Sequence, residues 1–268
     1  MTEDVIIERH AHILHLRMNR VAKKNALTRG MYTMMADAIF RAENDPDIRV
    51  ILFSGAPGCF TAGNDLKDFQ EQPPRDKAAP VYRFITALAQ STLPMVAAVD
   101  GIAVGIGLTL LLHCDIILAS ERAKFQLPFV NLGLLPEAGS TYLLPKLVGQ
   151  TRASELLMTG RLFEVQEAFD LGIVSRVILS GAASEESSNS ASPEGSPLER
   201  EARRVAEELA AKPPQALRAT KRLLKHDRDQ VENRIQWEIL EFSERLDSAE
   251  CKEALAAFQE KRKPVFTA

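Results

Sequence analysis

Apolar and polar residues are arranged in short runs that predict strands alternating with helices over the first two thirds of the chain. The run Ile13–Met18 predicts a strand, preceded by a second short apolar run at Val5–Ile7. Thr28 can cap a helix whose apolar positions recur at i, i+3 and i+4 from Met31 to Ala42. Further strands are predicted at Val50–Phe53, Met95–Val99, Asp115–Ala119, Lys124–Leu127 and Ile173–Leu179. This βα alternation predicts an α/β fold with a mostly parallel sheet and crossover helices.

The remaining helical patterns fall into two groups. Within the alternating part, helices are predicted at Pro80–Gln90, Gly107–His113, Glu137–Val148, Arg152–Thr159 and Val165–Leu171. The last part of the chain is wholly helical, with helices predicted at Leu198–Ala211, Pro214–Lys225, Val231–Leu246 and Ala249–Lys261. Four amphipathic helices need an apolar surface to cover, either the chain's own core or a neighbouring subunit, and we therefore expect an oligomer.

A serine-rich segment separates these two parts. Residues 180–197 contain seven serines, three glutamates and two prolines, with no lysine, arginine or aromatic residue. Such a composition cannot bury enough apolar surface to offset the entropy of ordering it. We therefore expect three regions: an α/β core over 1–179, a flexible connector over 180–197 and a helical region over 198–268.

Composition and charge exclude several classes of protein. The chain has 268 residues, of which 46% are hydrophobic, and 33 Lys+Arg against 36 Asp+Glu give a net charge of −3. No global charge therefore attracts it to nucleic acid or an anionic membrane. Three scattered cysteines do not make a disulfide framework, and no apolar run approaches the ~20 residues that span a bilayer. The acidic start lacks the features of a signal peptide, so we expect a cytoplasmic protein rather than a secreted, membrane or fibrous one.

Histidines and basic residues offer weaker signals. His10, His12 and His15 form an H-x-H-x-x-H string. On a continuous strand His10 and His12 share a face and His15 points the other way, so we expect edge histidines and no metal site. His113 shows no partner in the sequence. The basic residues of the tail are interleaved with glutamates and lack aromatic neighbours, which favours a solvated helix face over a nucleic-acid groove.

Two loops rich in small residues each end a predicted strand and open a helix. They are Ser54–Leu66 and Asp100–Leu108. The first N–H groups of a helix lack an intrahelical acceptor and favour negative charge. Two such loops on neighbouring strands can direct their N–H groups at one oxygen, which is an oxyanion hole made of backbone. Glycines also serve ordinary tight turns, so this pattern alone leaves both interpretations open.

Several spaced motifs together resemble one family. Asn25-Ala26-Leu27, Phe60 to Leu66, Gly101 to Gly107 with Cys114-Asp115, and Phe258-x-x-Lys261-Arg262 occur in the order and spacing of the crotonase (enoyl-CoA hydratase/isomerase) family. The resemblance extends from about Val5 to Phe266. It implies a crotonase-like (ClpP/crotonase) spiral of ββα units with a C-terminal helical trimerisation region. It also implies an acyl-CoA thioester substrate and an enolate held by two backbone N–H groups.

The resemblance places the site residues by motif. It assigns the two oxyanion N–H groups to Asn64 and Ile106, the adenine-facing turn to the stretch from Ala62 to Leu66, and a contact with the CoA phosphates to Lys24. In the family, the positions of Phe258 and Lys261 often reach the nucleotide of a neighbouring subunit. The predicted substrate and CoA residues are therefore Lys24, Ala62, Gly63, Asn64, Asp65, Leu66, Gly105, Ile106, Phe129, Phe258 and Lys261.

The carboxylates decide between the chemistries of the family. Hydratases resemble one another in two glutamates, and the corresponding positions here are Thr109 and Phe129. Adding water needs one group to activate it and another to deliver a proton, so hydration is disfavoured. Glu137 remains as a single base, in a segment similar to that of the monofunctional 3-enoyl-CoA to 2-enoyl-CoA isomerases. Glu137 can instead serve only the start of a helix, and Asp65 and Asp68 are expected to be capping or surface groups.

The resulting expectation is an enoyl-CoA isomerase of fatty acid metabolism (β-oxidation). It needs no cofactor, because CoA is part of the substrate, and no metal. The resemblance also implies a homotrimer or a hexamer of two trimers. Two alternatives stay open: an enoyl-CoA hydratase or other crotonase-type lyase or hydrolase, and a non-catalytic RNA-binding or scaffold member. The loop-like segment Lys67–Pro80 is expected to shape the acyl pocket.

Overall fold

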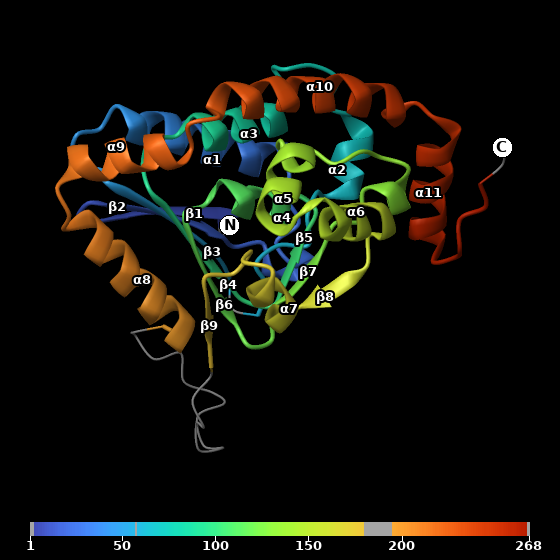
Figure 1. Ribbon diagram of the computed structural model, residues 1–268. Helices are drawn as coiled ribbons and strands as arrows, with labels where there is room; N and C mark the ends of the chain where they lie inside the picture. The colour runs from blue at the N-terminus through green and yellow to red at the C-terminus, as the bar shows by residue number, and fades with distance from the viewer. Residues whose placement is uncertain (1–2, 57, 180–194, 267–268) are drawn as a thin grey trace.

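A six-stranded sheet forms the centre of the molecule (Figure 1). The computed structural model describes residues 3–56, 58–179 and 195–266. The strand order is β1-β2-β3-β4-β6-β9, in which only the β1/β2 pair is antiparallel. The strands are β1 (Val5–His10), β2 (Ile13–Met18), β3 (Val50–Gly55), β4 (Met95–Val99), β6 (Ile116–Ser120) and β9 (Arg176–Ile178). The predicted, mostly parallel sheet is confirmed.

A second, three-stranded sheet lies beside the first. It has the order β5-β7-β8, with β5 (Ile102–Val104) parallel to β7 (Lys124–Gln126) and β8 (Leu162–Glu164) antiparallel to it. The sequence predicted β7 but neither of its partners, because strands of three residues are too short to show an alternation. This small sheet matters because β5 lies within the second of the two glycine-containing loops and β7 pairs with it.

One face of the large sheet is covered by helices from the first half of the chain. They are α1 (Arg29–Glu43), which Thr28 caps by accepting from the Met31 N–H, and α3 (Pro80–Gln90). Met31 and Met35 are about 1% exposed, so the predicted apolar face of α1 packs into the core. The other elements of the core are α4 (Ile106–Thr109), α5 (Ser140–Val148), α6 (Gln150–Thr159), α7 (Val165–Asp170) and the 3-10 helices η1 (Val21–Lys23), η2 (Leu110–His113) and η3 (Val130–Leu132).

Two differences from the sequence-based helix prediction affect the region of the site. The segment Lys67–Pro80 is not wholly a loop, because α2 (Leu66–Glu71) occupies its first part, with Asp65 as its cap. The helix predicted to start at Glu137 starts only at Ser140, because Ala138 and Gly139 both have positive φ (62° and 71°). Glu137 therefore lies in a loop before α5 rather than in its first turn.

The C-terminal helices complete the core rather than form a separate body. They are α8 (Pro197–Ala210), α9 (Pro214–Leu224), α10 (Arg228–Leu246) and α11 (Ala249–Glu260). Helix α8 packs on the face of the large sheet that α1 and α3 leave open, where its apolar residues meet Val50, Leu52 and Val96. Helix α10 runs along α3 and α5 (Figure 1). The tail thus covers the chain's own core, one of the two surfaces that the sequence left open.

The predicted connector ends earlier than residue 197. Ser196 caps α8 in a reciprocal pair with Glu199, and Pro197 is the first helical residue. A serine before a proline and three residues before a glutamate is a helix start, and this signal was assigned to the connector because of its composition. Residues 180–194 lie outside the described part of the chain.

The basic face of the tail is not wholly solvated. Lys221 of α9 is 6% exposed, and its ammonium lies 2.9 Å from a carboxylate oxygen of Asp115 and donates to the Leu93 carbonyl. Lys225 also pairs with Asp115. These two cations therefore hold α9 against the ends of β4 and β6. In the described part of the chain, no helix combines the length and the apolar character needed to cross a bilayer.

Candidate active site

The two glycine-containing loops lie side by side, as the sequence predicted. Thr61 donates its N–H to the Ile102 carbonyl at 2.9 Å and accepts from the Val104 N–H at 3.1 Å. At the base of the loops the Gly58 N–H donates to a carboxylate oxygen of Asp100 at 2.7 Å. Two connections that follow β3 and β4 are thereby held as a pair at one edge of the sheet.

Glycine is required where these loops touch. A Cβ on Gly107 would lie 2.5 Å from the Thr61 methyl group, so a larger residue would push the loops apart. Gly105 has φ 55° and ψ −118°, a conformation that residues with a side chain rarely adopt. The Phe129 ring lies against Gly105, with its tip 3.9 Å from where a Cβ would be.

Neither of the two predicted oxyanion N–H groups has a protein acceptor within the described residues. One belongs to Ile106, the first residue of α4, which has no acceptor within its helix. The other belongs to Asn64, whose neighbours Gly63 and Asp65 both bond to Leu27 on the opposite side of the chain. The predicted oxyanion donors are therefore both unpaired, which is the state that an oxyanion hole needs.

A buried asparagine holds the first loop in place. Asn25 is 0% exposed, has φ 54°, and donates its side-chain N–H₂ to the carbonyls of Cys59 and Phe60. Its own carbonyl accepts from the Thr61 hydroxyl at 2.7 Å. Asparagine is the residue that tolerates a left-handed backbone while supplying amide hydrogen bonds. The Asn25-Ala26-Leu27 motif thus positions the loop that carries Asn64.

Glu137 is a buried carboxylate with one free oxygen. It is 4% exposed, and the Thr109 hydroxyl donates to its Oε1 at 2.5 Å. Its Oε2 has no hydrogen-bond partner. Burial raises the pKa of Glu137 to about 8, although the hydrogen bond from Thr109 acts in the opposite direction. Thr109 ends the short helix α4 that Ile106 begins, so the base and one oxyanion donor are supported by the same helix.

A histidine that the sequence left without a partner supports this loop. His113 is 4% exposed, and its Nε2 lies 2.8 Å from the Ala138 carbonyl oxygen. A carbonyl only accepts, so Nε2 carries the proton. Burial lowers the pKa of His113 to about 4, so the ring is neutral at pH 7. His113 thereby fixes Ala138, whose positive φ sets the direction of Glu137.

Another glutamate accepts the hydrogen bonds of the donors at the start of α5. Glu238 of α10 is 6% exposed and accepts from the Gly139 N–H at 2.6 Å and from the N–H and hydroxyl of Thr141 at 3.0 and 2.6 Å. Burial raises the pKa of Glu238 to about 7. The side-chain hydrogen bonds at the start of α5 are therefore accepted by Glu238, which the sequence did not single out, and not by Glu137.

Two tyrosines join the site without having been predicted. The Tyr32 hydroxyl donates to the Asn64 side-chain oxygen at 2.5 Å, and its ring packs on Phe84. Burial raises the pKa of Tyr32, and the charge of Glu137 raises it further. The pKa of Tyr82 is raised by the same two causes. Both hydroxyls therefore remain protonated at neutral pH.

A cavity opens beside the first loop. It has a volume of about 390 Å³ and lies between α2, α3 and the segment that joins them. Asn64, Tyr32 and Phe69 are among its lining residues, whereas Ile106 and Glu137 are not. The lining residues from Gln72 to Pro80 agree with the expectation that the segment before Pro80 shapes a pocket.

The predicted CoA residues fall into two groups. Lys24, Ala62, Gly63, Asp65 and Leu66 lie around the first loop. Within that group the Asp65 side chain is already engaged, capping α2 and pairing with Arg20 at 2.6 Å. Asp68 pairs with Arg29, so both aspartates are capping or ion-pair groups, as predicted. Phe258 and Lys261, in contrast, lie exposed at the end of α11, where Gln259 donates a hydrogen bond to Gln70 of α2.

Comparison with known proteins fits this geometry. A family model described as enoyl-CoA hydratase/isomerase matches residues 8–268. The chain belongs to the enoyl-CoA hydratase/isomerase family. Among its relatives, an enoyl-CoA hydratase of Mycobacterium tuberculosis is 34% identical, with 98% of this chain and 96% of that protein covered. The enoyl-CoA delta isomerase 2 of Rattus norvegicus is 33% identical, with 96% of this chain and 63% of that longer protein covered.

Comparison with solved structures confirms the fold. Pseudomonas aeruginosa OdaA matches with a TM-score of 0.88 and 42% identity, covering 96% of this chain and 99% of that one. An enoyl-CoA hydratase/isomerase of Pseudoalteromonas atlantica matches with a TM-score of 0.88 and 38% identity, covering 99% of this chain and all of that one. The crotonase fold is thereby confirmed, and the protein is an enoyl-CoA hydratase/isomerase-type acyl-CoA enzyme.

Proposed function

We propose that this enzyme converts 3-enoyl-CoA to 2-trans-enoyl-CoA. The observation that carries the proposal is the state of Glu137: it is buried, one of its oxygens is free, and its pKa is raised to about 8. A carboxylate in that state takes a proton readily and also returns it near neutral pH. Moving the double bond requires only a base that can take up a proton and return it.

The steps balance with this one group. The Glu137 carboxylate takes a proton from C2, which the thioester makes acidic, and the electrons of the broken C–H bond form a dienolate with the charge on the thioester oxygen. The N–H groups of Asn64 and Ile106 hold that oxygen. The carboxylic acid form of Glu137 then gives its proton to C4, while the double bond moves from C3–C4 to C2–C3. The base ends in its starting state.

The backbone donors are assigned most of the rate enhancement. One oxyanion donor is worth roughly 10²–10³ in rate, and a positioned base about 10²–10⁴. Burial around Ile106 and Glu137, which are 0% and 4% exposed, strengthens both effects because little water screens them. Tyr32 supports the same assignment, since its hydrogen bond fixes the side chain next to one of the donors.

Hydration of 2-enoyl-CoA is the second candidate, because relatives named as hydratases match as well as those named as isomerases. Against it stand Thr109 and Phe129, the two positions where a hydratase of this family carries glutamates. Thr109 uses its hydroxyl on Glu137, and Phe129 is buried against Gly105. Neither can activate water, so we favour the isomerase.

Three further expectations belong to this proposal. Lys24 and the turn from Ala62 to Leu66 contact the CoA nucleotide, with Phe258 and Lys261 contributed by a neighbouring subunit. The enzyme is a homotrimer or a hexamer of two trimers and works in the cytoplasm. The exposed Leu223, Leu224, Trp237 and Leu240 of α9 and α10 support an assembly through this part of the chain. Light scattering coupled to size-exclusion chromatography measures the oligomer.

Two substrates test the reaction. Purified enzyme is incubated with 3-hexenoyl-CoA and, separately, with 2-hexenoyl-CoA. We expect the absorbance of the conjugated enoyl thioester to rise with the first substrate and no 3-hydroxyacyl-CoA to form from the second. The matched control for Glu137→Gln is Glu164→Gln, which changes an exposed glutamate that forms an ion pair with Lys124 on the surface. Hydration of 2-hexenoyl-CoA as the sole activity would reject the proposal.

A further inference from the structure

The histidine string near the N-terminus is arranged differently from the prediction. His15 was expected on the face opposite His10, and His12 on the same face. The strand is not continuous, however: β1 ends at His10, Ala11 (φ 50°) and His12 form a two-residue turn, and β2 starts at Ile13. Such a turn restarts the alternation. His15 now lies directly across from Glu8, and His10 shares their face.

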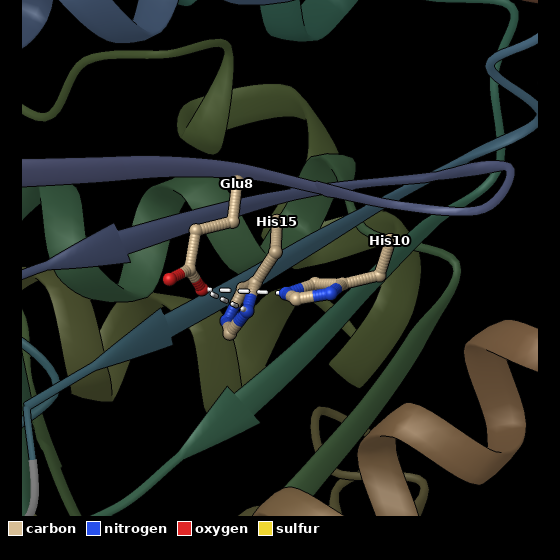
Figure 2. Close-up of side chains that lie close together, drawn as sticks. All are labelled: Glu8, His10 and His15. Carbon is tan, nitrogen blue, oxygen red and sulfur yellow. Dashed lines mark hydrogen bonds and ion pairs between the residues drawn. The ribbon is translucent and has the colours of Figure 1, made fainter.

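Glu8, His10 and His15 form a compact cluster on this hairpin (Figure 2). One potential ligand atom of each lies within 4.8 Å of the others. Glu8 Oε2 lies 3.4 Å from His10 Nε2 and 3.8 Å from His15 Nδ1. Tetrahedral zinc with ligand bonds of about 2.0–2.1 Å places neighbouring ligand atoms about 3.4 Å apart. The three atoms thus lie close to the spacing that zinc imposes.

A second observation points to a missing ligand. The His15 side chain is 9% exposed, and its Nδ1 is buried without a hydrogen-bond partner. Its other nitrogen, Nε2, lies 2.8 Å from the Ser54 hydroxyl. Metal-bound histidines characteristically donate their second N–H to such an oxygen, which leaves the first lone pair directed at the metal. Ser54 on β3 therefore orients His15 with Nδ1 toward Glu8.

The surroundings fit an open site. The side chains of Glu8 and His10 are 41% and 45% exposed, so water can occupy the fourth position of a tetrahedron. Arg17 and Arg203 bring positive charge to His15, which opposes a cation, and the Glu8 carboxylate offsets part of it. Two imidazoles and one carboxylate are a donor set that suits zinc among the divalent metals.

We propose that Glu8, His10 and His15 bind a divalent transition-metal ion of the Zn²⁺ class on the β1–β2 hairpin. The ion would join β1, the edge strand of the large sheet, to β2 through ligands from both strands. The site shares no residue with Glu137, Asn64 or Ile106, so it is independent of the proposed reaction.

Calorimetric titration with Zn²⁺ alone tests the site on the full-length, tag-free protein after chelator treatment and dialysis. We expect one ion per chain, a rise in Tm with Zn²⁺, and tetrahedral absorption bands when Co²⁺ replaces it. His10→Ala should weaken binding by more than about 10-fold, since even losing a supporting partner of a ligand has that effect. Glu8→Gln should weaken it too. Both side chains are exposed, so these variants keep the fold.

His12→Ala is the matched control. His12 is a half-buried histidine of the same hairpin, and its Nδ1 contacts the Asp47 carbonyl oxygen outside the cluster. It should bind Zn²⁺ as the unchanged protein does. The proposal is overturned if the unchanged protein shows no saturable binding, if His10→Ala binds equally well, or if His12→Ala loses binding to the same extent. Circular dichroism of each variant checks the fold.

Discussion

Glu137 and Glu238 are both buried beside the same loop, yet their hydrogen bonds differ. Glu238 accepts from the N–H of Gly139 and from both donors of Thr141, so each of its oxygens is used. Glu137 accepts one hydrogen bond, from Thr109, and its second oxygen has none. A satisfied carboxylate holds structure in place, whereas a carboxylate with a free oxygen keeps capacity for a proton.

The comparison shows that burial alone does not identify a catalytic acid. Burial raises the pKa of both groups, to about 8 and about 7. What separates them is the number of fixed donors, which stabilise the charged form of Glu238 and hold it in one position. The four predictions below test this distinction.

The largest expected effect is on turnover. Glu137→Gln should lower kcat for 3-hexenoyl-CoA by about 10²–10⁴-fold, because the amide cannot take the C2 proton. The KM and the circular dichroism spectrum should change little. Glu238→Gln keeps an acceptor for part of its hydrogen bonds and should keep kcat within about 10-fold. Equal losses of kcat in the two variants would contradict the distinction.

Stability should respond in the opposite order. Glu238→Ala leaves the buried donors at the start of α5 without an acceptor and should lower the free energy of unfolding by about 2–4 kcal/mol. Urea denaturation followed by circular dichroism measures this change. Glu137→Gln at the same pH should be at least as stable as the unchanged protein. If Glu238→Ala unfolds at the same urea concentration as the unsubstituted protein, the capping role of Glu238 is refuted.

The pH dependence follows from the raised pKa of Glu137. The base must be ionised in the free enzyme, so kcat/KM should rise with pH up to about 8. In folding, a carboxyl with a raised pKa stabilises the protein below its ordinary pKa of 4.5 and loses that contribution as pH rises toward 8. The Tm advantage of Glu137→Gln over the unchanged protein should therefore grow between these pH values. A constant difference would argue against the shift.

The smallest effect concerns the single hydrogen bond of Glu137. Thr109→Val preserves shape and removes the donor that lowers the pKa of Glu137. The midpoint of the kcat/KM profile should move to higher pH, with a several-fold loss at pH 7. Thr109→Ser retains a hydroxyl and should restore the profile. A midpoint that stays in place or moves down in Thr109→Val would show that the hydrogen bond does not tune the base.

Much of the fold was predictable because apolar periodicity determines it. Ile13–Met18, Pro80–Gln90 and Met95–Val99 occur with the predicted bounds. The short strands β5 and β8 were missed because three residues show no period. The start of α5 was placed three residues too early, because an alanine gives no signal that it adopts a positive φ.

The candidate site was predicted only in part: the sequence indicated the backbone donors but not the side chains that surround them. The loops rich in small residues indicated backbone donors, and the resemblance assigned the donors to Asn64 and Ile106 and the base to Glu137. The partners Tyr32, His113 and Glu238 were missed because they come from distant parts of the chain, and no spacing brings them together. The predicted orientation of His15 in the H-x-H-x-x-H string was wrong for a similar reason. The turn at Ala11 places His15 on the same face of the sheet as His10.

Helix α8 is made long after the strands it covers. The apolar residues Val50, Leu52 and Val96 leave the ribosome well before the segment ending at Ala210 that packs on them. Until that segment emerges, one side of the sheet exposes its apolar residues to solvent. Exposed apolar surface makes nascent chains aggregate or bind chaperones. Truncation within this helix should therefore reduce the yield of dispersed protein in the cell even though every strand of the sheet is present.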